Sequence, residues 1–158
     1  MCVTMKRPEH GPLRSVYYAV RGLGFALFNE RNLRVHFAAA AYVLWFSRYY
    51  SLGRVEYALL IMTIGIVIAA EMINTAIEKS IDVTVEDFNA LAGSAKDVAA
   101  GAVLVASLTS FGVGVALFWE PAVFLVIWED IIKAPLLHLF FVILTIIWIA
   151  PLGSLRKR

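Results

Sequence analysis

Residues 70–82 read Ala70-Glu71-Met72-Ile73-Asn74-Thr75-Ala76-Ile77-Glu78-Lys79-Ser80-Ile81-Asp82, and they bring carboxylates to the end of a long apolar run. A helix turns by about 100° per residue, so positions 71, 74, 78 and 82 fall at about 0°, 300°, 340° and 20°. These four side chains therefore form one narrow stripe. An ionisable group inside a transmembrane helix costs on the order of 3 kcal/mol. The stripe predicts a functional site in the membrane or at its surface.

The composition is that of a small integral membrane protein. Of the 158 residues, 61% are hydrophobic and only 16% are charged, whereas about a quarter of the residues of a soluble domain are charged. The mean hydropathy is +0.78. A net charge of +2 indicates no large basic surface, so we expect no nucleic-acid partner.

The N-terminal part predicts a flexible segment over residues 1–12 and an amphipathic helix over residues 13–28. Apolar residues recur there at spacings of three and four, but Arg14 and Arg21 interrupt the pattern too often for a membrane span. We expect this helix to lie on the membrane surface. A soluble helix docked on the remaining chain is the alternative.

Three apolar segments that follow predict membrane spans at about 33–50, 55–77 and 97–119, with a polar connection over residues 79–95. Together with the surface helix they form a predicted domain over residues 13–119. The third span is rich in alanine and glycine, which let helices approach closely, so it is predicted to be the central packing helix or an oligomer contact. The alternative is that these alanines only favour helix formation and mark no packing contact.

Residues 120–158 form a C-terminal extension. Its first part mixes charged and apolar residues and is interpreted as partly interfacial, whereas 134–155 has no charged residue and predicts a fourth span. His138 within it is interpreted as a packed histidine rather than a ligand.

The basic residues predict the orientation. With four spans, three basic residues (Arg48, Arg54 and Lys133) lie on one side, and the other side carries Lys6, Arg7, Arg14, Arg21, Arg31, Arg34, Lys79, Lys96, Arg156, Lys157 and Arg158. The positive-inside rule makes the larger group cytoplasmic. Glu30 and the acidic stripe then meet at the cytoplasmic boundary, where nucleotides are available.

This set of residues permits phosphoryl transfer. Carboxylate oxygens suit Mg²⁺, which uses one or two protein carboxylates and completes its shell with phosphates and water. The reaction needs little more than positioning, charge neutralisation and a base for the attacking hydroxyl. Glu71 lies deepest in the apolar run and is the candidate base.

Three motifs carry a resemblance to a known family. Asn29-Glu30-Arg31-Asn32-Leu33-Arg34-Val35-His36, Glu71-Met72-Ile73-Asn74-Thr75-Ala76-Ile77-Glu78 and Ala95-Lys96-Asp97-Val98-Ala99-Ala100-Gly101-Ala102-Val103 resemble the small bacterial membrane kinases that phosphorylate diacylglycerol or undecaprenol. The resemblance covers residues 13–119. It implies an all-α homotrimer in the bacterial cytoplasmic membrane, which transfers the γ-phosphate of MgATP to a lipid alcohol at the cytoplasmic face.

The resemblance also implies the roles of individual residues. Glu71 matches the catalytic base, and Glu30 and Glu78 match the Mg²⁺ ligands. The remaining residues that match the nucleotide site are Tyr18, Asn74, Asp82, Glu86, Lys96 and Asp97. Asn74 also matches a residue that supports the base. Asn89 stands where the family commonly has a histidine.

Alternatives remain for the lipid substrate and for the class of protein. The motif forms favour undecaprenol over diacylglycerol as the lipid substrate. Outside the kinases, an ion or proton transporter also places acids in a membrane, although here no polar path continues through the bilayer. A membrane assembly protein with purely structural ion pairs is the third reading.

Overall fold

The computed structural model describes residues 11–85 and 89–150, and it contains only helices there. The elements are α1 (Pro12–Asn29), α2 (Arg31–Phe46), a 3₁₀ turn η1 (Ser47–Tyr49), α3 (Arg54–Thr84), α4 (Ala90–Phe118), α5 (Pro121–Lys133) and α6 (Pro135–Ile149). The predicted all-α membrane fold class is confirmed.

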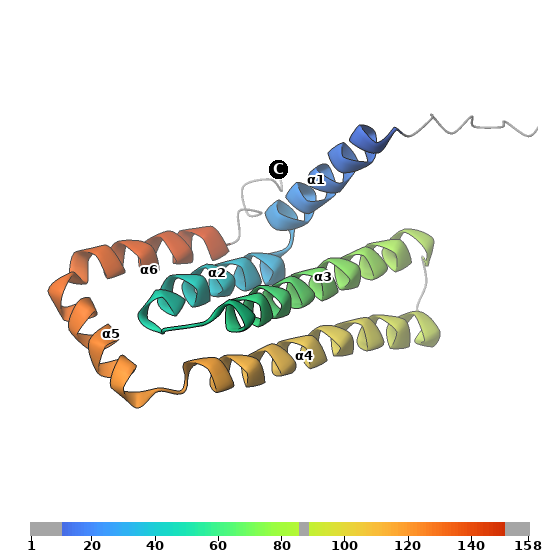
Figure 1. The fold of residues 1–158 in the computed structure, drawn as a ribbon. Helices are drawn as coiled ribbons and strands as arrows, with labels where there is room; N and C mark the ends of the chain where they lie inside the picture. The colour runs from blue at the N-terminus through green and yellow to red at the C-terminus, as the bar shows by residue number, and fades with distance from the viewer. Residues whose placement is uncertain (1–10, 86–88, 151–158) are drawn as a thin grey trace, which may run out of the picture.

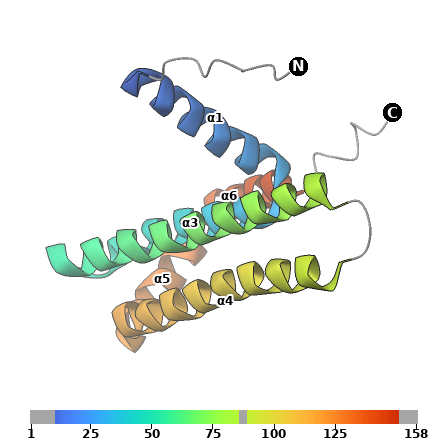
Figure 2. The same cartoon turned by 90° about the vertical axis from the view of Figure 1, so that its right-hand side faces the viewer.

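The two longest helices, α3 and α4, form the framework of the molecule. They have 31 and 29 residues, and both are long and apolar enough to cross a membrane. Figures 1 and 2 show them side by side and antiparallel. The hydroxyl of Ser110 on α4 donates a hydrogen bond to the carbonyl oxygen of Thr63 on α3, over 3.3 Å.

The central helix of the protomer is α3 rather than α4. Helix α3 contacts α1, α2 and α4, and its buried residues include Leu60, Val67 and Glu71. On α4 only Ala99 is buried. The small residues of α4 therefore do not make it the core helix, and the prediction that they form an oligomer contact still stands.

The predicted polar connection over residues 79–95 is wrong in its length. Helix α3 continues to Thr84, and α4 already begins at Ala90. The helices extend because polar side chains pair across them, as the Lys96–Asp82 ion pair shows. Asn89 caps α4, since its side-chain oxygen accepts hydrogen bonds from the backbone N–H groups of Leu91 and Ala92 over 2.9 and 3.2 Å.

Glu30 separates α1 from α2. Its backbone is extended, with φ −105° and ψ 119°, and α1 therefore leaves the bundle at an angle (Figure 2). The Arg34 side chain is buried and donates to the carbonyl oxygen of Phe28 over 3.3 Å, so it closes the end of α1. Arg34 is thus a structural residue of this junction rather than an anchor among lipid headgroups.

Helix α2 alone is short for a span. Its 16 residues correspond to about 24 Å, and η1 lengthens this segment toward the roughly 30 Å of a hydrocarbon core. The predicted span at 33–50 therefore stays a prediction.

The C-terminal extension consists of two helices, and α6 begins where the fourth span was predicted but has only 15 residues. Helices α5 and α6 meet at an angle of 94° around Ala134, and only together are they long and apolar enough to cross a membrane. Pro135 causes the break, because proline disfavours a helical conformation of the residue before it. Helix α5 crosses one end of the bundle, and α6 returns along α2 (Figure 1). The predicted residues 151–155 lie outside the described part of the chain.

Candidate active site

The predicted acidic stripe is present on α3, and its burial falls steadily along the helix. Glu71 is 3% exposed and Asn74 is 7% exposed. Glu78 is half-buried, and Asp82 is exposed. The same face of one helix therefore carries an enclosed carboxylate at one end and a solvent-accessible carboxylate at the other.

Asn74 links the buried and the accessible part of the stripe. Its Nδ2 donates a hydrogen bond to Oε1 of Glu78 over 3.0 Å. Its Oδ1 is buried and has no hydrogen-bond partner within the described residues. Asn74 thus orients Glu78 and keeps one acceptor available for a ligand or a water molecule.

Glu30 reaches α3 from the junction of α1 and α2. Its carboxylate lies 2.8 Å from Nζ of Lys79, and the same Nζ lies 5.5 Å from the ring centroid of Phe25. This ion pair places Glu30 beside the helical turn that carries Glu78. Sequence reasoning did not assign Lys79 to the site, although it directly follows Glu78 in the matching motif.

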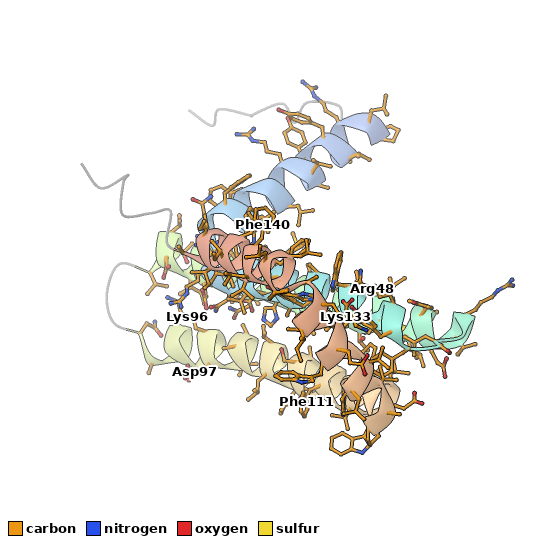
Figure 3. The ribbon with its side chains drawn as sticks, turned by 90° about the vertical axis from the view of Figure 1, so that its left-hand side faces the viewer. Arg48, Lys96, Asp97, Phe111, Lys133 and Phe140 are labelled. Carbon is orange, nitrogen blue, oxygen red and sulfur yellow. The ribbon has the colours of Figure 1, made fainter. Side chains whose placement is uncertain are left out.

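Lys96 joins the stripe from α4, because it forms an ion pair with Asp82 of α3. Asp97 is exposed, and Figure 3 shows Lys96 on the side of α4 that faces α3 and Asp97 on the opposite side. The structure therefore brings Lys96 into the cluster within one protomer and leaves Asp97 outside it.

Tyr18 and Glu86 complete the set of predicted site residues. Tyr18 lies on α1, 44% exposed, and the 12 residues that separate it from Glu30 correspond to about 18 Å along a helix. Glu86 lies outside the described residues.

The predicted magnesium ligands are compatible with the ion. The described residues contain no group of three or more metal-binding side chains. Mg²⁺ typically takes only one or two protein carboxylates and completes its shell with water and phosphate oxygens. Glu30 and Glu78 supply two carboxylates next to the same turn of α3, and the buried Oδ1 of Asn74 is a further oxygen acceptor there.

An apolar cavity of about 420 Å³ lies between α2, α3 and α4. Leu60, Thr63 and Val67 of α3 line it, with Ala39 and Ala40 of α2 opposite. Glu71 follows Val67 by four residues and therefore lies on the same face one helical turn further on. The wall of the cavity on α3 therefore ends about one helical turn before the buried carboxylate.

Comparison with known proteins shows the family to which this chain belongs. Residues 17–118 match the sequence model of the family described as prokaryotic diacylglycerol kinase. The chain is 36% identical over 105 residues to an undecaprenol kinase from Bacillus subtilis, which covers 66% of this chain and 85% of that protein. It is 35% identical over 116 residues to a diacylglycerol kinase from Synechocystis, which covers 73% of this chain and 66% of that protein.

A more distant relative, a diacylglycerol kinase from Escherichia coli, is 27% identical over 108 residues, or 68% of this chain and 88% of that protein. The family model ends at residue 118, so the α5–α6 extension lies beyond it. The sequence resemblance, the helical membrane fold and the matched residues together identify the chain as a membrane lipid kinase of the prokaryotic diacylglycerol kinase family.

Proposed function

We propose that this kinase transfers the γ-phosphate of ATP to the terminal hydroxyl of undecaprenol at the cytoplasmic face of the bacterial inner membrane. The observation that carries the proposal is an apolar cavity whose α3 wall ends at Val67 and Ile68, about one helical turn before the buried Glu71. A lipid alcohol with its hydrocarbon chain between α2, α3 and α4 would present its hydroxyl to that carboxylate.

Glu71 is the proposed general base. Its carboxylate takes the proton of the lipid hydroxyl while the hydroxyl oxygen forms a bond to the γ-phosphorus. The bond between this phosphorus and the oxygen that bridges it to the β-phosphate breaks, and ADP leaves with that electron pair. The burial of Glu71 keeps water away from the reacting atoms.

Glu30 and Glu78 are the proposed ligands of Mg²⁺, which would neutralise charge on the phosphates of ATP when it is bound. Asn74 orients Glu78 through their hydrogen bond. Asp82, Lys96 and Asp97 are proposed to hold the nucleotide at the accessible end of the stripe, together with Tyr18 and Glu86. Lys96 can turn from Asp82 to a phosphate group, because both side chains are partly exposed.

Two features support the proposed assembly and orientation. Most of the small-residue helix α4 is exposed in the protomer, which suits the contact surface of a homotrimer. Arg31 and Arg34 at the start of α2, Lys79 near the end of α3 and Lys96 near the start of α4 lie at the end of the bundle that carries the acidic stripe. This placement suits a cytoplasmic location. A trimer also offers Asp97 a neighbouring protomer with which to complete a nucleotide site.

Undecaprenol is favoured over diacylglycerol by sequence similarity. The chain is more similar to the undecaprenol kinase of Bacillus subtilis than to the diacylglycerol kinase of Escherichia coli, at 36% against 27% identity. Diacylglycerol remains the second candidate because the Synechocystis relative is 35% identical.

The test is transfer of labelled phosphate from MgATP by the purified protein in mixed micelles. Undecaprenol and diacylglycerol are offered separately at equal mole fraction, with Glu71→Gln as the control. We expect labelling of undecaprenol with a kcat/KM at least about 10-fold above that for diacylglycerol. Preferred labelling of diacylglycerol would assign the enzyme to phosphatidate synthesis instead.

A further inference from the structure

The cavity between α2, α3 and α4 is bounded at one end by the C-terminal extension. Its wall includes Trp119, which follows α4, and Phe124 in the first turn of α5. Both residues lie beyond residue 118, where the kinase family model ends. Helix α5 crosses the end of the bundle away from the acidic stripe (Figure 1). The two aromatic residues therefore form the end of the cavity that is farthest from Glu71.

The polarity of the cavity wall changes from one end to the other. Toward Glu71, the first wall residues of α2 and α4 are polar, namely His36 and Ser107. Toward α5, the last wall residues of the same two helices are apolar, namely Val43 and Phe118. Burying a hydroxyl among apolar side chains costs free energy. A lipid alcohol therefore fits the cavity with its hydroxyl at the Glu71 end and its hydrocarbon chain toward α5.

Contacts within the chain hold the aromatic end of the cavity in place. The backbone N–H of Glu120 donates to the carbonyl oxygen of Phe118 over 2.9 Å, in the turn between α4 and α5. The ring of Phe118 packs edge-on against Tyr50, with 4.9 Å between the ring centroids. Further along α5, Asp130 accepts a hydrogen bond from the hydroxyl of Tyr49. Helix α5 is therefore attached near both of its ends, so Phe124 belongs to a fixed wall.

The length of the cavity limits how much of a lipid chain it can hold. Leu60 belongs to the α5 end of the wall on α3, and Glu71 lies eleven positions further along this helix, or about 16.5 Å. A fully extended chain advances by at most about 3.6 Å per three bonds, so roughly 14 chain bonds fit into this length. An isoprenoid unit contributes four chain bonds, and about three to four units therefore fill the cavity.

We propose that α5 is the end wall of the lipid site and that Phe124 limits the part of the lipid chain that the kinase recognises. The recognised part is the segment of about three to four isoprenoid units next to the hydroxyl, and the remaining units of a longer polyprenol lie outside the cavity. This inference rests on the proposed function, because it takes the cavity to hold the chain of the lipid substrate. The C-terminal extension thus contributes a specificity-determining residue.

The test is transfer of labelled phosphate from MgATP by the full chain in mixed micelles. The acceptors are polyprenols of two to six isoprenoid units and undecaprenol, each at equal mole fraction. We expect kcat/KM to rise by about 3-fold or more between two and four units, because each unit adds packing contacts with the wall. From five units to undecaprenol it should change by less than about 1.5-fold. A steady rise up to undecaprenol would overturn the proposed limit.

Two variants should move this limit in opposite directions. Phe124→Ala removes the end wall and should raise the limit by about one isoprenoid unit. Gly114→Leu fills the cavity from α4, since Gly114 lines the wall and an added Cβ there meets no atom within 4 Å. It should lower the limit by about one unit, because a helical turn of about 5.4 Å is lost.

Each variant has a matched control on the same helix. Leu125 is 68% exposed, follows Phe124 directly and is absent from the cavity wall, so Leu125→Ala should keep the limit of the natural protein. Gly112 is also absent from the wall, and an added Cβ there meets no atom within 4 Å. Gly112→Leu should therefore keep this limit as well. A shifted limit in either control would contradict the assignment of the wall.

An unchanged limit in folded Phe124→Ala or in folded Gly114→Leu would overturn the role of α5 as the end wall. Circular dichroism and gel filtration establish folding, and the limit is read from ratios of kcat/KM within one variant, so that a lower overall rate does not affect it. Diacylglycerols with acyl chains of increasing length separate this inference from the proposed substrate. Phosphorylation of diacylglycerols alone would contradict undecaprenol, whereas a limit near roughly 14 chain bonds that Phe124→Ala extends would still support the end wall.

Discussion

The two ends of the helix bundle place charged residues in very different surroundings. At one end, α3 carries Glu71 in a buried position and Asp82 in an exposed one. At the other end, Asp130 of α5 is held by Tyr49 and Arg48 beside the aromatic wall of α2 and α6. The first arrangement keeps oxygen acceptors, such as Oδ1 of Asn74, available for a metal ion. The second is paired within the chain and joins elements together.

This difference shows how one helix can serve two purposes. Helix α2 presents one face to the cavity that ends near Glu71 and the other to an apolar cavity between α2 and α6. The first face belongs to the part of the chain that matches the kinase family. The second is covered only because this chain continues into α5 and α6. Changes at the two ends should therefore separate catalysis from stability.

The largest effect is expected for Glu71→Gln. Loss of the proposed base should lower kcat by about 1,000-fold, because amide nitrogen and oxygen cannot take the proton of the lipid hydroxyl. Labelled phosphate transfer measures the rate, and gel filtration with circular dichroism confirms folding. A folded variant with full activity would show that Glu71 is not the base. The end of the bundle that carries the acidic stripe could then no longer be called the reactive one.

The next effect concerns magnesium. Glu78→Gln should raise the Mg²⁺ concentration for half-maximal activity by at least about 10-fold, because one of the two proposed ligands is lost. Glu56→Gln is the matched control, since Glu56 lies at the opposite end of α3 and accepts a hydrogen bond from the backbone of Gly53. An identical magnesium dependence in both variants would contradict the assignment of Glu78.

Adjacent alanines test the two faces of α2 directly. Ala40→Trp fills the cavity that ends near Glu71 and should lower kcat/KM for the lipid by about 10-fold, with the KM for ATP unchanged. Ala41→Trp fills the cavity between α2 and α6, whose wall includes Ala41, and should leave lipid kinase kinetics within about 2-fold of the natural protein. Steady-state kinetics in mixed micelles measure both. Equal losses in the two variants would show that the faces are not independent.

The smallest effect is expected from the hydrogen bond between Tyr42 and Thr145. A double-mutant cycle of Tyr42→Phe and Thr145→Val should give a coupling of about 0.6 kcal/mol, which is typical of such bonds between membrane helices. Unfolding by sodium dodecyl sulfate in mixed micelles measures it. A coupling near zero would mean that this bond does not hold α6 against α2.

The sequence predicted the helices well where the apolar pattern was strong and less well where polar residues continued a helix. The surface helix predicted at 13–28 corresponds to α1, and the span at 55–77 lies within α3. The polar connection at 79–95 was mispredicted, because charged residues were interpreted as loop although Lys96 and Asp82 pair between two continuing helices. The pairing of residues that are distant in the sequence cannot be predicted from the local pattern of polar and apolar residues.

The candidate site shows the same limit. The 3.6-residue period of a helix was enough to place Glu71, Asn74, Glu78 and Asp82 on one face, and the gradient of burial along them is found in the structure. The pairing of Glu30 with Lys79 was missed. It depends on how the junction of α1 and α2 is directed against α3.

The sequence by itself determined that this is an all-helical membrane protein with a stripe of acids at the end of a span, because composition and helical period are properties of neighbouring residues. Only the tertiary structure decided that α5 and α6 bend by 94°, that α6 lies along α2 and that Tyr42 and Thr145 form a hydrogen bond between these two helices. These features depend on contacts between segments about 100 residues apart, which no local periodicity specifies.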